Sequence, residues 1–257
     1  MKLRKGQQLK EHASEIIERL RKLYPDAHCE LNFTNPLELL VATILSAQCT
    51  DKRVNIVTRD LFKKLRTAAD YARIPQEELE ADIKSTGFFR SKSKSLRSMA
   101  QDLVNKFHGK VPAAMEELTS LAGVGRKTAN VVLGNAFHID DGIVVDTHVR
   151  RLAQRLGLTR QEDPDKIESE LMKLVPQNDW TNFSHWLIWH GRRCCYAQKP
   201  DCAHCGLATI CPGFDELSKL SAAEKPAKAK PAPKKAAPVS PAFSRKPGSE
   251  HSASTVQ

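Results

Sequence analysis

The segment Leu118-Thr-Ser-Leu-Ala-Gly-Val-Gly-Arg-Lys-Thr-Ala-Asn-Val-Val-Leu133 places two glycines between two stretches of helical apolar spacing. We expect one helix to end before Gly123 and another to begin near Arg126. Glycines allow the backbone to turn with positive φ and to come close to a ligand. The amide groups in the first turn of the second helix lack partners within the helix and lie at its positive dipole end. The segment is therefore predicted to form a cradle for an anion.

Two kinds of anion-binding loop have a composition of this sort. The nucleotide-binding pattern G-x-x-x-x-G-K-[ST] requires glycine directly before lysine, whereas Arg126 separates Gly125 from Lys127 and no strand is expected upstream. The cradle therefore suits a DNA phosphate better than a nucleoside triphosphate. Two helices joined by a glycine hairpin, here within residues 113–137, form the helix-hairpin-helix motif, which contacts the DNA backbone rather than the base edges. Gly123, Gly125 and Arg126 are accordingly predicted to bind DNA.

Outside this segment the apolar periodicity is also helical almost throughout. The run Ile143-Val144-Val145 is the only tempting strand pattern, and it is too short and isolated to start a sheet. The sequence therefore predicts an all-α protein of about ten helices. The expected helices cover residues 9–23, 36–45, 51–66, 91–107, 113–121, 126–137, 147–156, 164–175 and 179–190.

The composition bounds the size of the protein and the nature of its partner. The 257 residues are enough for one large or two small domains, and 40 basic against 30 acidic residues give a net charge of +10. A basic balance favours a polyanion such as nucleic acid. No apolar run of about 18 residues is present, so we expect no membrane span. From about Glu216 the chain is rich in Ala, Lys, Pro and Ser, which predicts a disordered tail, either merely solubilising or attracted to phosphates.

Four cysteines follow one another at the spacing C-x6-C-x2-C-x5-C. No signal peptide is recognisable, so we expect an intracellular protein, in which a metal or iron–sulfur site is a better explanation than disulfides. A single C-x2-C with outlying cysteines favours a [4Fe–4S] cluster over zinc. Cys194 could replace Cys195 on paper, and Cys29 and Cys49 are expected to be buried small hydrophobes. The predicted ligands are Cys195, Cys202, Cys205 and Cys211.

Two further residues have the properties that a nucleophilic reaction requires. Lys127 lies in the first turn of the second hairpin helix, where the helix dipole and Arg126 should bias its amine towards the neutral, nucleophilic form. An ordinary lysine there would simply contact a phosphate. Asp146, 19 residues later, follows an apolar run and precedes a helix. It is expected to cap that helix, a role compatible with catalysis because a capped carboxylate is rigid and ionised.

Taken together, these segments resemble the endonuclease III family, the iron–sulfur DNA glycosylases of base excision repair. The similarity extends from about residue 10 to residue 214 and follows the order of the family's motifs. The matching stretches are Leu45–Asp51, Leu121–Leu133, Val145–Val149, His185–Arg192 and the four-cysteine loop.

The resemblance implies a bifunctional DNA glycosylase and abasic-site (AP) lyase that acts on oxidised pyrimidines in duplex DNA. It also implies two all-α lobes: a six-helix barrel at 29–139, and a lobe combining the N-terminal helix (1–28) with the C-terminal helices and [4Fe–4S] loop (140–214). The tail would then be 215–257. A monomer in the bacterial cytoplasm, associated with the nucleoid, is the corresponding expectation.

The resemblance also implies roles for individual residues. Lys127 would be the nucleophile and Asp146 its acidic partner. Gln48 would enter the gap left by the flipped nucleotide, although a buried structural glutamine is the alternative interpretation. Phe88 would be the second wedge, at a position where a leucine is familiar.

Further assignments concern residues in or beside the matching segments. Asp51 matches an active-site position but could equally cap the helix that begins there, and His148 is assigned to DNA binding within its matching segment. His185 and His190 are interpreted as packing or hydrogen-bonding groups. Arg192, Arg193 and Lys199 could meet phosphates.

Two other functions are compatible with part of this sequence. A monofunctional mismatch glycosylase of the same fold would lack the lysine nucleophile and would carry a further folded domain, so Lys127 and the tail argue against it. A non-catalytic helix-hairpin-helix DNA-binding protein would not need both Lys127 and Asp146. An enzyme is therefore the favoured prediction.

Overall fold

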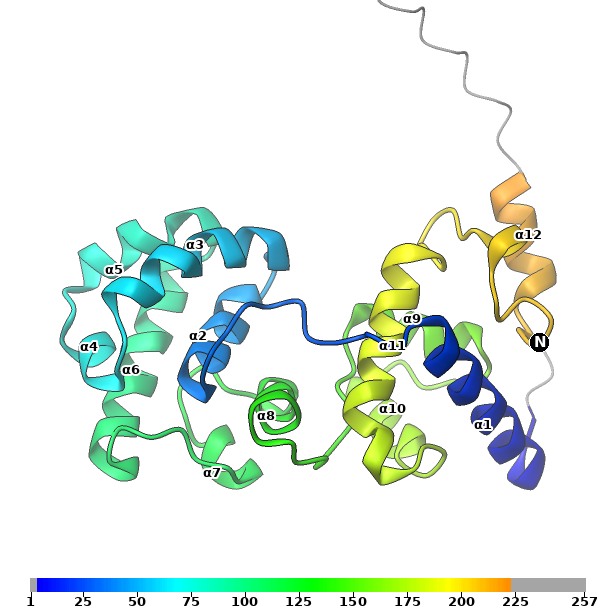
Figure 1. The fold of residues 1–257 in the computed structure, drawn as a ribbon, viewed down its shortest axis with the longest axis horizontal. Coiled ribbons are helices and arrows are strands. Elements are labelled where there is room, and N and C mark those ends of the chain that lie inside the picture. Colours follow the sequence, from blue (N-terminus) through cyan, green and yellow to red (C-terminus); the bar gives the residue numbers. More distant parts are fainter. Residues whose placement is uncertain (1–3, 223–257) are drawn as a thin grey trace, which may run out of the picture. The chain divides into compact units, whose positions relative to one another are not determined.

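The computed structural model describes residues 4–222. Within that range all regular secondary structure is helical, and there is no strand (Figure 1). The prediction of an all-α protein is thus confirmed for this part of the chain. Short 3-10 turns lie at Lys84–Thr86, Gln177–Asp179 and Cys202–His204, and a π-helix covers Leu133–Phe137. The α-helices are α1 (Gly6–Leu23), α2 (Pro36–Ser46), α3 (Asp51–Lys64), α4 (Ala68–Arg73), α5 (Gln76–Ile83), α6 (Phe89–Phe107), α7 (Met115–Thr119), α8 (Arg126–Val132), α9 (Thr147–Arg155), α10 (Pro164–Leu171), α11 (Trp180–Arg193) and α12 (Phe214–Ala222).

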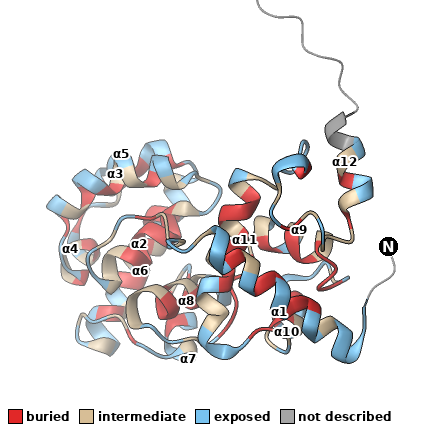
Figure 2. Cartoon of the chain, turned by 45° about the vertical axis from the view of Figure 1, so that its right-hand side comes forward, coloured by how far each residue is buried: buried red, intermediate tan, exposed pale blue. Residues whose placement is uncertain are grey.

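The first lobe is built around α2, which is buried along most of its length (Figure 2). Asn35 starts this helix because its side chain accepts a hydrogen bond from the Glu38 amide at 3.0 Å, and Pro36 occupies the first turn, where no amide donor is needed. Its apolar residues are packed on all sides, so the helix lacks a solvent-facing stripe. The core around α2 is continuous from Leu31 to Leu133.

A second apolar core joins segments from the two ends of the described chain. Ile16 and Leu20 of α1 pack with Val149 and Leu152 of α9 and with Leu187 of α11. The N-terminal helix therefore belongs with the C-terminal helices and not with the helices that follow it directly. This grouping supports the proposed division into a barrel lobe at 29–139 and a second lobe made of 1–28 and 140–214.

Several predicted boundaries were wrong. α4 and α5 were missed because each is too short for its apolar spacing to be recognised, although the Thr67–Asp70 capping box was visible in the sequence. The predicted tail begins too early, because residues 214–222 form α12 and Leu217 is buried. The rest of the predicted tail, 223–257, lies outside the described residues. No helix within 4–222 combines the length and apolarity needed to cross a membrane.

Candidate active site and metal centre

The glycine hairpin between α7 and α8 depends on only one of its two glycines for its conformation. Gly123 has φ +78°, and a Cβ there would lie 2.8 Å from the Cβ of Ser95. Gly125 has φ −93° and caps α8, so the predicted positive φ at this position is wrong. A Cβ on Gly125 would meet nothing within 4 Å, and the residue is exposed. The backbone at Gly125 is therefore open to a ligand.

Residues predicted from separate motifs line one large cavity. Both lobes contribute to it: the α2–α3 loop and α8 from the first, and α9 and α11 from the second. The structure thus brings together five of the predicted site residues. Lys127, Asp146, Gln48, Asp51 and His148 all lie in its wall.

Asp146 is the N-cap of α9, as expected. Its Oδ1 accepts hydrogen bonds from the amides of His148 and Val149, both at 2.8 Å. Because Oδ1 makes both of these bonds, the carboxylate is held in one orientation while Oδ2 remains available at the cavity. Lys127, in the first turn of α8, is exposed and faces the same cavity.

The two predicted wedge residues share an unusual backbone conformation. Gln48 (φ +53°) and Phe88 (φ +47°) are both left-handed. Gln48 is exposed at the cavity, so its interpretation as a buried structural glutamine is wrong. Phe88 is 65% exposed and lies outside the cavity lining, at the N-terminus of α6. A left-handed aromatic residue is a genuine backbone outlier, and such strain is concentrated at functional sites.

Asp51 is held by an ion pair and does not cap α3. The cap is Thr50, whose hydroxyl accepts from the Arg53 amide at 3.3 Å. The Asp51 carboxylate lies 2.7 Å from the guanidinium of Arg192, which also pairs with Glu30. The expected phosphate contact of Arg192 must therefore compete with two carboxylates.

Arg126 is engaged with a residue that the sequence analysis did not single out. Its Nε and Nη2 donate to both oxygens of the buried Glu168, at 2.8 and 3.0 Å. Asn130 also donates to Glu168 Oε1 at 2.9 Å. The charge of Arg126 is thus balanced by the Glu168 carboxylate. No sequence motif marks Glu168, because its partners lie about 40 residues away.

Two histidines at the cavity are shifted towards their neutral forms. Burial lowers the pKa of His185 to about 4. Its Nε2 lies 2.8 Å from Asn135 Oδ1, in keeping with the predicted hydrogen-bonding role. Burial also lowers the pKa of His148, and the nearby Asp146 carboxylate partly opposes this effect. Cys29 and Cys49, expected in the core, are only partly buried and line this cavity too.

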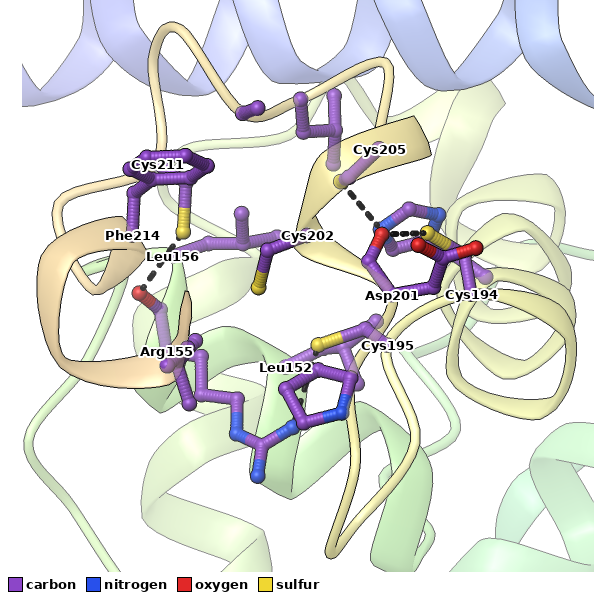
Figure 3. A pocket seen from close by; sticks show the side chains of 15 residues that line it. Leu152, Arg155, Leu156, Cys194, Cys195, Asp201, Cys202, Cys205, Cys211 and Phe214 are labelled. Carbon is purple, nitrogen blue, oxygen red and sulfur yellow. Dashed lines mark hydrogen bonds between the residues drawn. The ribbon is translucent and has the colours of Figure 1, made fainter. Parts of the chain in front are cut away.

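The four predicted cysteine ligands, all from the loop that follows α11, lie around a second cavity (Figure 3). Its wall is otherwise largely apolar, with Leu152, Leu156 and Phe214 contributing side chains. Arg155 Nη1 donates to Cys195 Sγ at 3.3 Å. This guanidinium lies where it can balance the negative charge of a metal-bound sulfur.

His190 and Cys194 are close enough to compete for a metal in this region. Their donor atoms and Cys205 Sγ all lie within 4.8 Å of one another. His190 Nδ1 also lies 2.9 Å from the Tyr24 hydroxyl, which orients the ring. The sequence predicts a packing or hydrogen-bonding role for His190, in keeping with the Tyr24 contact, whereas its proximity to Cys205 depends on the folding of the loop.

The sequence and the fold are those of a known class of proteins. The profile of the HhH-GPD superfamily of base excision DNA repair proteins matches residues 41–177. Endonuclease III of Synechocystis sp. is 55% identical over 210 residues, covering 82% of this chain and 96% of the relative. Endonuclease III of Bacillus subtilis is 46% identical over 196 residues, covering 76% and 89%.

Solved structures agree with these relatives. A non-covalent complex of endonuclease III with DNA matches with a TM-score of 0.78 and 44% identity, over 82% of this chain and 98% of the other. A trapped covalent endonuclease III–DNA intermediate matches with a TM-score of 0.77 and 45% identity, over 80% and 97%. The chain belongs to the endonuclease III family of this superfamily.

Family membership confirms the predicted fold and activity. The protein is a bifunctional DNA glycosylase and AP lyase of base excision repair with the helix-hairpin-helix glycosylase fold. The two alternative functions weighed from the sequence are thereby set aside. The family relationship also suggests a metal cluster. In the described part of the chain, donor atoms gather for a metal at the cysteine cavity.

Proposed function

We propose that Lys127 and Asp146 carry out this reaction on oxidised pyrimidines in duplex DNA. The observation that carries the proposal is the shared cavity: an exposed amine and a fixed carboxylate from opposite lobes line the same space. An extruded nucleoside needs a pocket of this kind, because the target carbon cannot be reached inside the base stack.

The proposed steps follow from the chemistry of the two groups. Neutral Lys127 attacks C1′ of the flipped deoxyribose, and the bond to the damaged base breaks with its electron pair leaving on the base. Asp146 stabilises the positive charge that develops on the sugar and assists proton transfer. The amine at C1′ becomes a Schiff base as the sugar ring opens. Loss of the C2′ proton then expels the 3′ phosphate by β-elimination and nicks the strand.

Gln48 and Phe88 are proposed to fill the gap that the flipped nucleotide leaves. The exposure of both side chains and their left-handed backbone support this assignment. An inserted aromatic or amide group replaces lost stacking contacts, and an apolar wedge parts neighbouring bases. The phenylalanine is larger than the familiar leucine, so the preference for the opposite base should differ from that of leucine-bearing relatives.

The DNA backbone is proposed to bind at the hairpin. Exposed Gly125, with open space where a Cβ would be, leaves room for a phosphate, and Gly123 sets the turn. His148, Asp51 and Arg126 complete the proposed DNA-facing set. The last two would act partly through their ion pairs with Arg192 and Glu168.

We further propose that Cys195, Cys202, Cys205 and Cys211 hold a [4Fe–4S] cluster. Four thiol groups around one largely apolar cavity suit such a group, and Arg155 supplies a charge-balancing donor to Cys195. When bound, the cluster would cross-link the four cysteines of the loop and supply a local electrostatic field. It would take no part in the steps above. The loop would then be ordered by its own metal ligands.

Serine variants distinguish this ligand set from one built on His190, Cys194 and Cys205. We predict that Cys211→Ser loses bound iron and the visible absorbance of the cluster, while Cys194→Ser keeps both, because only Cys211 is in the proposed set. The purified variants are compared by metal analysis and absorbance. The opposite pattern would assign the site to His190, Cys194 and Cys205.

A panel of lesion-bearing duplexes tests the proposed substrate class. The protein is expected to remove thymine glycol and nick that strand, and to leave adenine mismatches uncleaved. Gel analysis of end-labelled strands gives the result directly. Cleavage confined to the mismatch, or binding without a nick, would contradict the proposal.

A further inference from the structure

Lys92 is a buried lysine to which neither the fold nor the proposed reaction assigns a role. It lies in α6, four residues after Phe88, and is only 6% exposed. A buried ammonium group is costly unless its donors are satisfied. Here its Nζ donates to the carbonyl oxygens of Leu45 and Thr86, each at 2.8 Å.

The two acceptors belong to the two segments that carry the proposed wedge residues. Leu45 is in the last turn of α2, three residues before Gln48, and Thr86 lies two residues before Phe88. These segments are distant in sequence but are joined through one side chain. Lys92 therefore links the Leu45 and Thr86 carbonyls directly.

The backbone explains why an outside donor is needed at the Leu45 carbonyl. In a regular helix the Cys49 amide would donate to the Leu45 carbonyl, but it donates instead to Ser46 at 3.0 Å, where the chain turns towards Gln48. At the second segment the Lys92 amide makes an ordinary helical hydrogen bond to the carbonyl of the N-cap Phe88, at 3.0 Å. Lys92 thus contacts the backbone beside both Gln48 and Phe88.

We propose that Lys92 is a positioning residue that fixes Gln48 and Phe88 relative to one another, so that the two enter the DNA gap as one unit. The inference rests on the wedge roles in the proposed function. It assigns Lys92 no contact with DNA or with the reacting sugar. Its effect should be confined to the steps that depend on base extrusion.

The first test separates base removal from strand nicking. Lys92→Met keeps the length of the side chain and removes its donors, whereas Lys94→Met removes an exposed charge from the same helix. We expect Lys92→Met to slow single-turnover thymine glycol removal by about tenfold, since small misplacements of positioning groups cost rates of this order. Nicking of a preformed abasic site, which has no base to unstack, should change by less than about threefold. Lys94→Met should change neither rate.

The second test asks whether Lys92 acts through the wedges. In a Gln48→Ala/Phe88→Ala background, Lys92→Met should slow base removal by less than about twofold more, because coupled residues are not additive. A full tenfold loss in that background would overturn the proposal and indicate a merely structural role. If Gln48→Ala/Phe88→Ala with the native Lys92 removes the base at an unchanged rate, the wedge assignment is overturned, and the role of Lys92 with it. This outcome differs from the previous one because it does not involve a change at Lys92.

Thermal unfolding by circular dichroism accompanies both tests. If Lys92→Met does not fold, Lys92→Arg takes its place, since it keeps a charge and donors but its larger planar head must move the two carbonyls apart. We expect the arginine variant to fold and to show the same selective loss of base removal. Equal losses in base removal and abasic-site nicking would overturn the proposal.

Discussion

Asp146 combines a visible structural task with the catalytic task proposed for it. Asparagine caps helices about as well as aspartate, because its side-chain oxygen accepts the same amide hydrogen bonds. We therefore predict that Asp146→Asn unfolds within about 0.5 kcal/mol of the native protein but removes base at least about tenfold more slowly, because the negative charge is lost. Thermal unfolding and single-turnover kinetics measure the two effects. An asparagine variant with full activity would rule out a role for the charge.

His185 should make stability depend on pH below neutrality. Burial lowers its pKa from 6.5 to about 4, so between these values the unfolded chain binds a proton that the folded chain does not. The contribution of His185 to the free energy of unfolding is fully present above about pH 6.5. It is lost as the pH falls towards 4, and the loss amounts to at most about 3 kcal/mol. We predict a shallower fall for His185→Gln, measured by urea unfolding between pH 4 and 7. Identical slopes would contradict the assignment.

At the scale of single residues, the sequence predicted which residues are chemically reactive better than it predicted which residues pair with one another. The types and motifs of Lys127 and Asp146 pointed to one site, and the shared cavity agrees with that prediction. The engagement of Arg126 with Glu168 and of Asp51 with Arg192 could not be predicted. Both pairs join residues far apart in the chain, and only the folded backbone brings them within reach.

Among the structural elements, the glycine hairpin offers a matched pair of positions. Alanine at Gly123 would need a left-handed backbone and would lie 2.8 Å from the Cβ of Ser95, whereas alanine at Gly125 has an ordinary φ and open space. We predict that Gly123→Ala loses about 1–3 kcal/mol of stability. Gly125→Ala should be nearly neutral for stability but should weaken DNA binding, because its methyl group occupies the proposed phosphate approach. Chemical denaturation and salt-controlled DNA titration measure the two effects, and unchanged DNA affinity for Gly125→Ala would contradict the phosphate role.

Helices were predicted correctly where the apolar pattern repeats over many residues, and they were missed where it covers only a few. The spacing in α1, α3 and α6 was sufficient to predict each helix. α4 and α5 are too brief for a helical period to emerge, and their packing against α6 is set by the tertiary fold. α12 was missed because the residues that follow it dominate the local composition, and among its residues 214–219 Leu217 is the one that is buried.

For the described part of the molecule as a whole, the cavity depends on how the chain is divided between the lobes. The α8 hairpin brings Lys127 from the barrel lobe, and the cap of α9 brings Asp146 from the other. Arg192 on α11 pairs with Glu30 and with Asp51, which precede it by more than a hundred residues. The order of the motifs predicted this division through family resemblance, whereas the cross-lobe ion pairs could be found only in the structure.

The central claim is that the amine of Lys127 bonds to the sugar of an extruded nucleotide. Borohydride reduction of the reaction on a thymine glycol or abasic duplex tests it most directly, because a reduced Schiff base leaves protein and DNA covalently joined. The native protein and Lys94→Met are expected to form this adduct, and Lys127→Ala is expected to bind the duplex without forming it. An adduct of undiminished yield with Lys127→Ala would contradict the account and assign the nucleophile to another residue.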